Sequence, residues 1–428
     1  MISLLSNRDD IPLSFIGHYM RSILRLLSMP SDLHAKEKKI LLLLGAAYLI
    51  GAYDMTLVTL ALPDIQASFS IAEEELGNLI AYARLGAIPA VLLALVADRI
   101  GRRKLLVMTL IGLSLFSLAT AFAQSAMQFI ILQSAAKFFI TLEEVLAVIF
   151  ALEVLPARHR GWGVGFLAAM GGLGAGLGAM LYSTVEYLPG GWRALYVMGS
   201  FAILYIAFLR RNLPESPMFE KQSHNIKSSL WQPLLEIFTQ HRRALLALAV
   251  ISATFWFQIG ANLNFMSKYL QSSHGYSPGE VSMLFVVAGA FAIFGNVVAG
   301  KVSDTIGRRP TLVFGIVANC AAFLAFYNSS SLLLPLAWIA ALFSFFIVDV
   351  VVTAATGELF PTSCRSTAAS LRVVVAVLAG AVGLAAEGVL YSHFGSHATA
   401  LSLLTLSSLL GLPAVALWLR ETANTELS

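Results

Sequence analysis

The sequence predicts an all-α membrane protein with twelve transmembrane helices in two pseudo-symmetric six-helix bundles. Of its 428 residues, 58% are hydrophobic and only 12% are charged, a composition that excludes an ordinary soluble protein. A set of charged motifs also occurs twice, about 205 residues apart, and each motif ends a long apolar segment. Such repeated helical halves are typical of membrane proteins that expose a central site to either side in turn.

The spans follow from apolar stretches of roughly 20 residues, the length that crosses a bilayer as a helix. The twelve predicted spans are residues 40–62, 75–97, 104–124, 127–155, 161–185, 192–210, 244–270, 280–302, 310–328, 331–358, 366–391 and 394–418. The predicted domains are an N-terminal segment (1–39), two bundles (40–210 and 244–418), a linker (211–243) and a tail (419–428). We expect a short amphipathic helix in the linker, around residues 231–238.

Three charged motifs mark the two halves in register. They are residues 98–103 with their copy 304–309, residues 153–160 with 358–365, and Glu215 with Glu421. The first motif reads Asp-Arg-Ile-Gly-Arg-Arg in one half and Asp-Thr-Ile-Gly-Arg-Arg in the other. The second has the pattern Glu-x-x-Pro, followed by an arginine, in both halves.

The distribution of basic residues predicts the orientation. Lys and Arg are concentrated in the loops after spans 2, 4, 6 and 8, whereas the loop after span 1 is acidic. The positive-inside rule therefore places both termini in the cytoplasm, and we expect a bacterial inner-membrane protein that works as a monomer. This bias also explains the net charge of +4, so it gives no reason to expect a nucleic-acid partner.

Several chemistries lack residues to support them. Cys320 and Cys364 are the only cysteines, so no disulfide framework is implied. There is no P-loop, no metal-spaced Cys/His group and no nucleophile motif. We therefore expect neither an enzyme nor a pump driven by ATP, and no cofactor or metal.

Together, the repeated motifs resemble those of the major facilitator superfamily over essentially the whole chain. The Leu-Pro-Glu-Ser-Pro sequence at 213–217 looks like the sugar porter and organic-ion or metabolite branches. This resemblance implies two bundles that rock about a substrate cavity, and a cytoplasmic lock of ion pairs that holds the outward-facing state. The residues it assigns to the lock are Asp98, Arg102, Arg103, Glu153, Arg160, Glu215, Asp304, Arg308, Arg309, Glu358, Arg365 and Glu421.

The sequence departs from the family pattern at three positions. Ala94 stands where the first loop motif usually has glycine, and Gln133 stands where span 4 often begins with arginine. The glycine run of span 5 has Leu177 in place of the proline expected of drug antiporters. This last departure argues against drug/proton antiport.

Three charged residues inside the first bundle are predicted to lie at one depth. Asp54 is 15 residues after Lys39, Arg84 is 14 before Asp98, and Lys137 is 16 before Glu153. At 1.5 Å per residue all three lie roughly 21–24 Å from the cytoplasmic boundary. Ionisable groups at such depth suggest function. Arg84 and Lys137 could bind a carboxylate, with Asp54 as a proton site; alternatively, the three charges could neutralise one another as structure.

Two further acids occupy equivalent positions in the repeat. Glu144 and Asp349 each lie nine residues before the glutamate of the second motif, which puts them near the midplane. A buried carboxylate is a natural proton carrier, so both are candidates for coupling. Salt bridges from Glu144 to Lys137 and from Asp349 to Arg372 are the alternative. Glu143 points about 100° away from Glu144 on a helix and is a weaker candidate.

Span 7 offers a face suited to a small polar solute. Gln258 and Asn262 are one turn apart and Trp256 lies nearby, so we expect these three residues to contact substrate; packing is the alternative for the aromatic ring. Glu387, His393 and His397 lie near the outer end of span 11 and are expected to be interfacial.

The sequence therefore predicts a secondary transporter, with proton-coupled transport of a small organic anion as the first hypothesis. Its partners would be a small-molecule substrate, protons and the lipid bilayer. One alternative is a proton-coupled exporter of a cation, metal or drug, in which the acids are the ligands. A second is a non-transporting receptor with the same fold.

Overall fold

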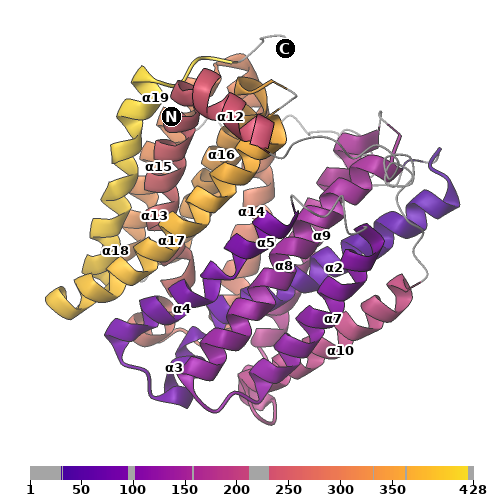
Figure 1. The fold of residues 1–428 in the computed structure, drawn as a ribbon. Helices are drawn as coiled ribbons and strands as arrows, with labels where there is room; N and C mark the ends of the chain where they lie inside the picture. The colour runs from indigo at the N-terminus through magenta and orange to yellow at the C-terminus, as the bar shows by residue number, and fades with distance from the viewer. Residues whose placement is uncertain are drawn as a thin grey trace, which may run out of the picture.

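The computed structural model describes residues 30, 32–94, 102–156, 159–211, 231–330, 332–361 and 364–422. Over these residues all regular secondary structure is helical. Figure 1 shows two groups of long helices that meet near α4 and α17 and diverge toward the ends that carry α12 and α9.

The first group, which we call the N bundle, runs from α2 to α10. Its elements are α2 (Ala35–Leu60), α3 (Leu62–Phe69), η1 (Glu73–Glu75), α4 (Leu76–Leu85), α5 (Ala87–Ala94), α7 (Arg102–Ala121), α8 (Ala126–Val154), α9 (Arg160–Tyr182), η3 (Val185–Tyr187) and α10 (Trp192–Arg210). Within it, α2 packs against α9, α10 and α8, and α7 packs against α8 and α10.

The second group, the C bundle, runs from α12 to α19. Its elements are α12 (Trp231–Gln240), α13 (Arg242–His274), α14 (Pro278–Thr305), α15 (Arg308–Asn328), α16 (Leu334–Leu359), α17 (Arg365–Phe394), α18 (His397–Leu406), η4 (Ser407–Gly411) and α19 (Leu412–Leu417). Helix α16 packs against α14 and α15, and α13 packs against α17. Helix α12 is the short helix predicted in the linker.

The helices agree with the predicted spans. Among the described residues, nine helical segments are long and apolar enough to cross a membrane. Three predicted spans are not among the nine. Helix α8 carries Lys137, Glu143 and Glu144 in its middle. The second predicted span is divided between α4 and α5 at Gly86, and the apolar stretch of α14 found among the described residues, Pro278–Ala292, is shorter than a full span.

A buried ion pair ties together four helices of the N bundle. Arg210 Nη1 at the end of α10 lies 2.5 Å from Glu143 Oε1 on α8, and both side chains are buried. Thr109 of α7 donates to the other Glu143 oxygen at 2.5 Å, and Arg210 Nε and Nη2 donate to the Leu43 carbonyl of α2. Arg210 is therefore an internal charge at the end of the sixth predicted span.

The two bundles touch where glycines allow their backbones to approach. A Cβ on Gly77 of α4 would lie 2.0 Å from the Leu384 carbonyl oxygen of α17, and one on Gly388 would lie 2.1 Å from that of Glu74. Only glycine, which has no Cβ, fits at such positions. Ser267 of α13 also donates to the Leu60 carbonyl of α2 at 2.6 Å. We call this end of the molecule the far side.

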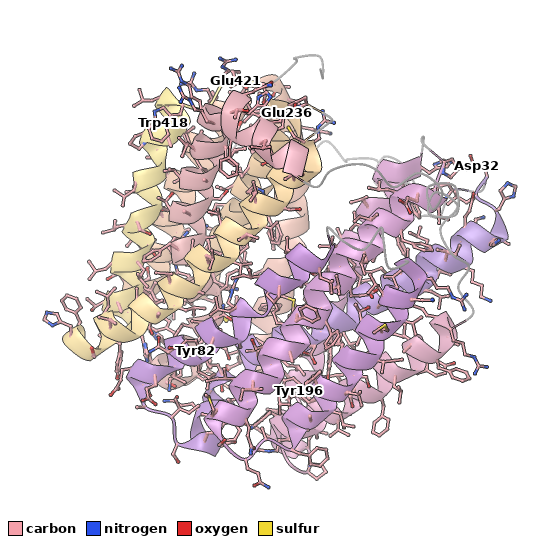
Figure 2. The ribbon with its side chains drawn as sticks, viewed as in Figure 1. Asp32, Tyr82, Tyr196, Glu236, Trp418 and Glu421 are labelled. Carbon is pink, nitrogen blue, oxygen red and sulfur yellow. The ribbon has the colours of Figure 1, made fainter. Side chains whose placement is uncertain are left out.

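The opposite end, where the repeated motifs lie, we call the motif side. Glu421, Trp418 and Glu236 are found there on the C bundle, and Asp32 lies at the corresponding end of the N bundle (Figure 2). The ribbons of the two bundles separate toward this side (Figure 1). The molecule is thus joined on the far side and divergent on the motif side.

Candidate functional site

The second-half copy of the motifs forms a connected ion-pair network. Arg308 donates to both oxygens of Glu358, from Nε at 3.2 Å and from Nη2 at 2.7 Å, the bidentate geometry that suits a guanidinium and a carboxylate. Asp304 Oδ1 lies 2.7 Å from Arg308 Nη2. Glu421 accepts from the backbone N–H groups of Arg308 and Arg309 at 2.7 and 3.1 Å. Its negative charge therefore caps the N-terminus of α15.

The glycine of the motif is required by this geometry. Gly307 has φ +112°, in the region that favours glycine. A Cβ there would lie 2.7 Å from Glu421 Oε2. Glycine is therefore needed at this position for two reasons: the backbone has a positive φ, and the Glu421 carboxylate lies where a Cβ would stand.

The last arginine of each copy makes an equivalent contact. Arg309 donates to the backbone carbonyls of Val415, at 3.2 Å, and Ala416. Arg103 Nη2 donates to the carbonyl of Arg211 at 2.7 Å. Both copies therefore join the motif loop to the end of the sixth span of their own half.

The remaining predicted lock residues are described only in part. Asp98 and Glu215 lie outside the described residues, as do the side chains of Arg102 and Arg160. Arg365 Nε donates to the Phe360 carbonyl at 3.3 Å, and Glu153 also has an interaction partner. The contacts of Arg308, Arg309 and Arg365 given above lie within the C bundle, so pairing between the bundles stays a prediction.

Asp54 is buried inside the N bundle. Its Oδ1 accepts a hydrogen bond of 2.5 Å from Ser117 of α7, and its Oδ2 has no hydrogen-bond partner. Tyr196 of α10, which Figure 2 labels, lies close enough to interact with its charge. A carboxylate oxygen that is buried without a donor disfavours the ionised form, because nothing replaces the lost water.

Arg84 and Lys137 lie close enough to each other for their charges to interact. Lys137 also lies within electrostatic range of Asp54 and Glu144. The predicted cluster is therefore assembled, but without direct ion pairs among its described members. Lys137 Nζ contacts Met55 Sδ at 3.1 Å. The Arg84 side chain reaches the other bundle, since a Cβ on Gly380 of α17 would lie 3.6 Å from its Nη2. Both basic side chains are only partly buried.

The two acids predicted at the midplane have different surroundings. Glu144 is partly exposed and lies within charge range of Lys137. Asp349 pairs with Arg372 of α17 at 4.0 Å, and Arg372 Nη2 also donates to Thr353 at 3.3 Å. The alternative predicted for Asp349, a salt bridge to Arg372, is thus present. No such ion pair holds Glu144 among the described residues.

The amides predicted to bind substrate instead hydrogen-bond inside the C bundle. Gln258 donates to Asn319 at 2.9 Å and accepts from Asn262, which also donates to Thr405 at 2.9 Å. Gln258 and Asn262 are both fully buried. Trp256 is partly exposed and packs edge-on against Phe345 at 5.8 Å. Of the three, only Trp256 retains exposed surface for a solute.

A second cluster of charges joins the bundles on the far side. Lys268 Nζ of α13 lies 2.9 Å from Glu73 Oε1, and His397 Nε2 lies 2.9 Å from Glu73 Oε2. The other ring nitrogen of His397, Nδ1, lies 2.6 Å from Glu387 Oε1. Burial raises the pKa of Glu73, but hydrogen bonds from His397, Lys268 and Gln66 outweigh burial and hold the pKa below its usual value.

The sequence treated these far-side residues as interfacial and did not bring them together. His397 and Glu387 lie 324 and 314 residues after Glu73 (397 − 73 and 387 − 73), so no local spacing links them. One signal was present: Lys268 is an ionisable residue at the end of a predicted span, opposite an acidic loop.

Three potential metal ligands also converge near the motif side, where Glu236 is labelled (Figure 2). Ligand atoms of Glu236, His241 and Cys364 all lie within 4.8 Å of one another. The sequence predicted no such group, because Cys364 follows His241 by 123 residues (364 − 241). These side chains come from the end of α12, the start of α13 and the start of α17.

Comparison with known proteins agrees with this architecture. The sequence pattern of the Major Facilitator Superfamily matches residues 44–270 and 253–427. The chain is 28% identical over 382 residues, 84% of its length and 85% of the relative's, to the probable 4-methylmuconolactone transporter of Cupriavidus pinatubonensis. It is 27% identical over 368 residues to the cis,cis-muconate transport protein of Acinetobacter baylyi, covering 81% and 86% of the two chains.

Among solved structures, the xylose transporter XylE from E. coli in its inward-open conformation has the same fold. It superposes with a TM-score of 0.75 at 17% identity, covering 91% of this chain and 98% of its own. The resemblance read from the repeated motifs is thereby confirmed. The protein belongs to the Major Facilitator Superfamily of membrane transporters.

Proposed function

We propose that this protein is a proton-coupled carrier of a small organic anion, a carboxylate metabolite, that works by alternating access. The observation that carries the proposal concerns the charge partners of Arg84 and Lys137. Both are ionisable residues inside membrane-spanning helices, and neither forms an ion pair with a carboxylate in the described part of the chain. Charges placed in a membrane protein at such cost are retained for function. A substrate carboxylate supplies the missing partner.

The position of Arg84 supports a site between the bundles. Its guanidinium approaches Gly380 and therefore α17, while its helix belongs to the N bundle. A bound anion at this guanidinium contacts both bundles, so its binding energy differs between the two facing states. That difference is what allows a substrate to drive alternating access.

The names of two relatives support the substrate class. The Acinetobacter baylyi relative is named for cis,cis-muconate, a dicarboxylate, and the Cupriavidus pinatubonensis relative for 4-methylmuconolactone. Small planar carboxylates suit a guanidinium, which pairs with both carboxylate oxygens at once. Lys137 then neutralises a second charge or holds the same carboxylate from another side.

We assign the coupled proton to Asp54. Its buried Oδ2 lacks a donor, so this environment favours the protonated acid, and hydration in another state would favour release. Its ionised form attracts Lys137, which lies within charge range, and so competes with the substrate. Protonation of Asp54 frees Lys137 for the anion. Proton and anion then move in the same direction. In this proposal the motif side faces the cytoplasm, and Glu144 is the second candidate for the coupled proton.

A ligand screen tests the proposal against its competitors. Thermal unfolding of the purified protein is measured with organic acids, including cis,cis-muconate, and with organic cations, sugars and divalent metals. A carboxylate that raises the unfolding temperature in proportion to its concentration is the expected result, because a ligand that binds only the folded state stabilises it. Stabilisation by cations or metals, with none from any carboxylate, would contradict the proposal and favour the cation exporter.

A further inference from the structure

The far-side cluster contains a histidine whose two ring nitrogens both face carboxylates. His397 Nδ1 lies 2.6 Å from Glu387 and Nε2 lies 2.9 Å from Glu73. Both distances are those of hydrogen bonds, and the two acids come from different bundles: Glu73 lies in η1 of the N bundle and Glu387 in α17 of the C bundle. The imidazole therefore bridges the bundles where they meet.

Counting protons shows what this bridge requires. A neutral imidazole has one N–H donor and one acceptor nitrogen, and ionised carboxylates have no donor at all. With two carboxylates in contact, one pair of acceptors would face each other unless a second proton is present. This geometry therefore requires one proton more than a neutral histidine and two ionised glutamates supply.

The surroundings favour holding that proton within the bridge. Glu387 is fully buried and its Oε2 has no hydrogen-bond partner, so an uncompensated negative charge there is costly. Lys268 neutralises the charge of only one of the two carboxylates, because its Nζ pairs with Glu73. A proton on the imidazole, or on Glu387 itself, brings the cluster of two acids, one lysine and one histidine to zero net charge.

Other titratable groups face the bridge from the elements packed around it. Tyr391 of α17 stacks on the His397 ring with centroids 4.2 Å apart, and Glu74 of η1 lies within charge range of Tyr391. Tyr327 of α15 lies within charge range of Glu387. The tyrosines are neutral near pH 7, so they do not change the charge of the bridge.

We propose that Glu73, His397 and Glu387 form an outer gate that binds one proton when it closes and releases it when it opens. The inference goes beyond the anion site: it concerns a second proton-binding site, on the far side, that is distinct from Asp54. It requires only that the bundles separate on the far side during the cycle. When they do, Glu73 moves away from His397, the histidine reverts to an ordinary surface imidazole, and the extra proton is lost near neutral pH.

The far-side opening can be measured between two exposed loop positions. Tyr187 ends η3 in the N bundle and Leu332 precedes α16 in the C bundle, and their side chains are 84% and 83% exposed. Spin labels are attached at Tyr187→Cys and Leu332→Cys in a Cys320→Ala/Cys364→Ala background. Pulsed electron paramagnetic resonance then measures the distance between the two labels across the far side. The full-length protein in lipid nanodiscs is titrated from about pH 8 to about pH 5, the range over which imidazole changes charge.

The expected result is a shift toward the short distance as the pH falls. One bound proton changes the closed-to-open ratio by up to about tenfold per pH unit. Glu387→Gln should keep the gate able to close but remove most of this slope, because the amide can donate to a neutral ring nitrogen. His393→Gln is the matched control, since His393 is exposed on the same helix and should leave the slope unchanged.

Three outcomes would overturn the proposal. They are a distance distribution that does not change with pH in the parent protein, a wild-type slope in folded Glu387→Gln, and loss of the slope in His393→Gln. Asp54→Asn separates this gate from the coupling site, because it should retain the pH dependence of the closed-to-open ratio. If that dependence were lost with Asp54→Asn and kept with Glu387→Gln, the proton would belong to Asp54. If Glu387→Gln does not fold, Glu73→Gln, at a position that is partly exposed, should likewise lose the slope, with a longer mean distance because Lys268 and His397 lose the charge that they contact.

Discussion

The guanidinium of Arg84 in the N bundle lies against Gly380 in the C bundle, where a Cβ would stand 3.6 Å from Nη2. The same Cβ would lie 3.4 Å from the carbonyl oxygen of Trp256. Gly380 is also where α17 packs closely on α13, because a Cβ on Gly260 would lie 2.5 Å from the Gly380 carbonyl oxygen. The guanidinium beside it has no carboxylate partner among the described residues. We place the substrate carboxylate here.

A larger side chain at Gly380 should weaken substrate binding. Gly380→Val adds two methyl groups beyond a Cβ that already meets Arg84 and Trp256, so we expect the Kd for the best carboxylate to rise roughly tenfold, about 1.4 kcal/mol. Gly289→Val on α14 is the control, because nothing lies within 4 Å of its Cβ position. Isothermal titration of both folded variants makes the comparison. Equal affinity in the two would place the substrate elsewhere.

The proton site makes a separate prediction about pH. Substrate binding by the parent protein should strengthen as pH falls, because protonation of Asp54 frees Lys137. Asp54→Asn mimics the protonated acid, so it should bind well at all pH values and lose most of this dependence. In proteoliposomes it should exchange substrate but fail to accumulate it under a pH gradient. Gradient-driven accumulation by this variant would remove Asp54 from the role and leave Glu144 to be tested.

The buried pair of Arg210 and Glu143 should be a stability element rather than part of transport chemistry. Either Arg210→Gln or Glu143→Gln leaves one charge buried without its partner, which typically costs roughly 3–5 kcal/mol. The double variant should lose much less than the sum of the two single losses. Unfolding of all four proteins in detergent gives this coupling. Additive losses would mean that the two charges are stabilised independently.

The pKa of Glu73 sets the acid limit of the far-side contact. Burial raises this pKa, but the hydrogen bonds from His397, Lys268 and Gln66 lower it overall. A depressed pKa means that the contribution of Glu73 to closure is fully present above the ordinary value of about 4.3 and is lost as pH falls through the lower value. The spin-label distance should therefore shorten from about pH 8 to about pH 5 and lengthen again in stronger acid. Monotonic closure down to pH 3 would contradict this.

Much of the fold could be predicted because the physics involved is local. Spans of apolar residues become helices wherever water is absent, so α2, α7 and α10 begin and end within a few residues of the predicted spans. The repeated motifs gave the ion pairs of Arg308 with Asp304 and Glu358, because copies at equal offsets occupy equivalent places.

Side-chain direction was harder to predict, because it depends on packing between helices. Counting the rise per residue placed Asp54 at the depth of Lys137, yet Asp54 turns to Ser117. Gln258 and Asn262 share a helical face as expected, but that face meets α15 and α18 of its own bundle. Depth follows from sequence spacing, whereas rotation about the helix axis follows from neighbours that spacing does not reveal.

The most direct test of the anion site is binding of cis,cis-muconate, or the best carboxylate from the screen, to Arg84→Gln and Lys137→Gln. Each substitution removes a charge-assisted hydrogen bond, so the affinity measured by titration should fall by about 1.5–3 kcal/mol, with unfolding temperatures close to that of the parent. Arg193→Gln, on the far side, is the control: Arg193 Nη2 already donates to the Ala123 carbonyl at 2.9 Å, and its loss should not change affinity. Affinity that is unchanged or higher in both folded variants would contradict the account, because it would mean that these charges repel the substrate or do not reach it.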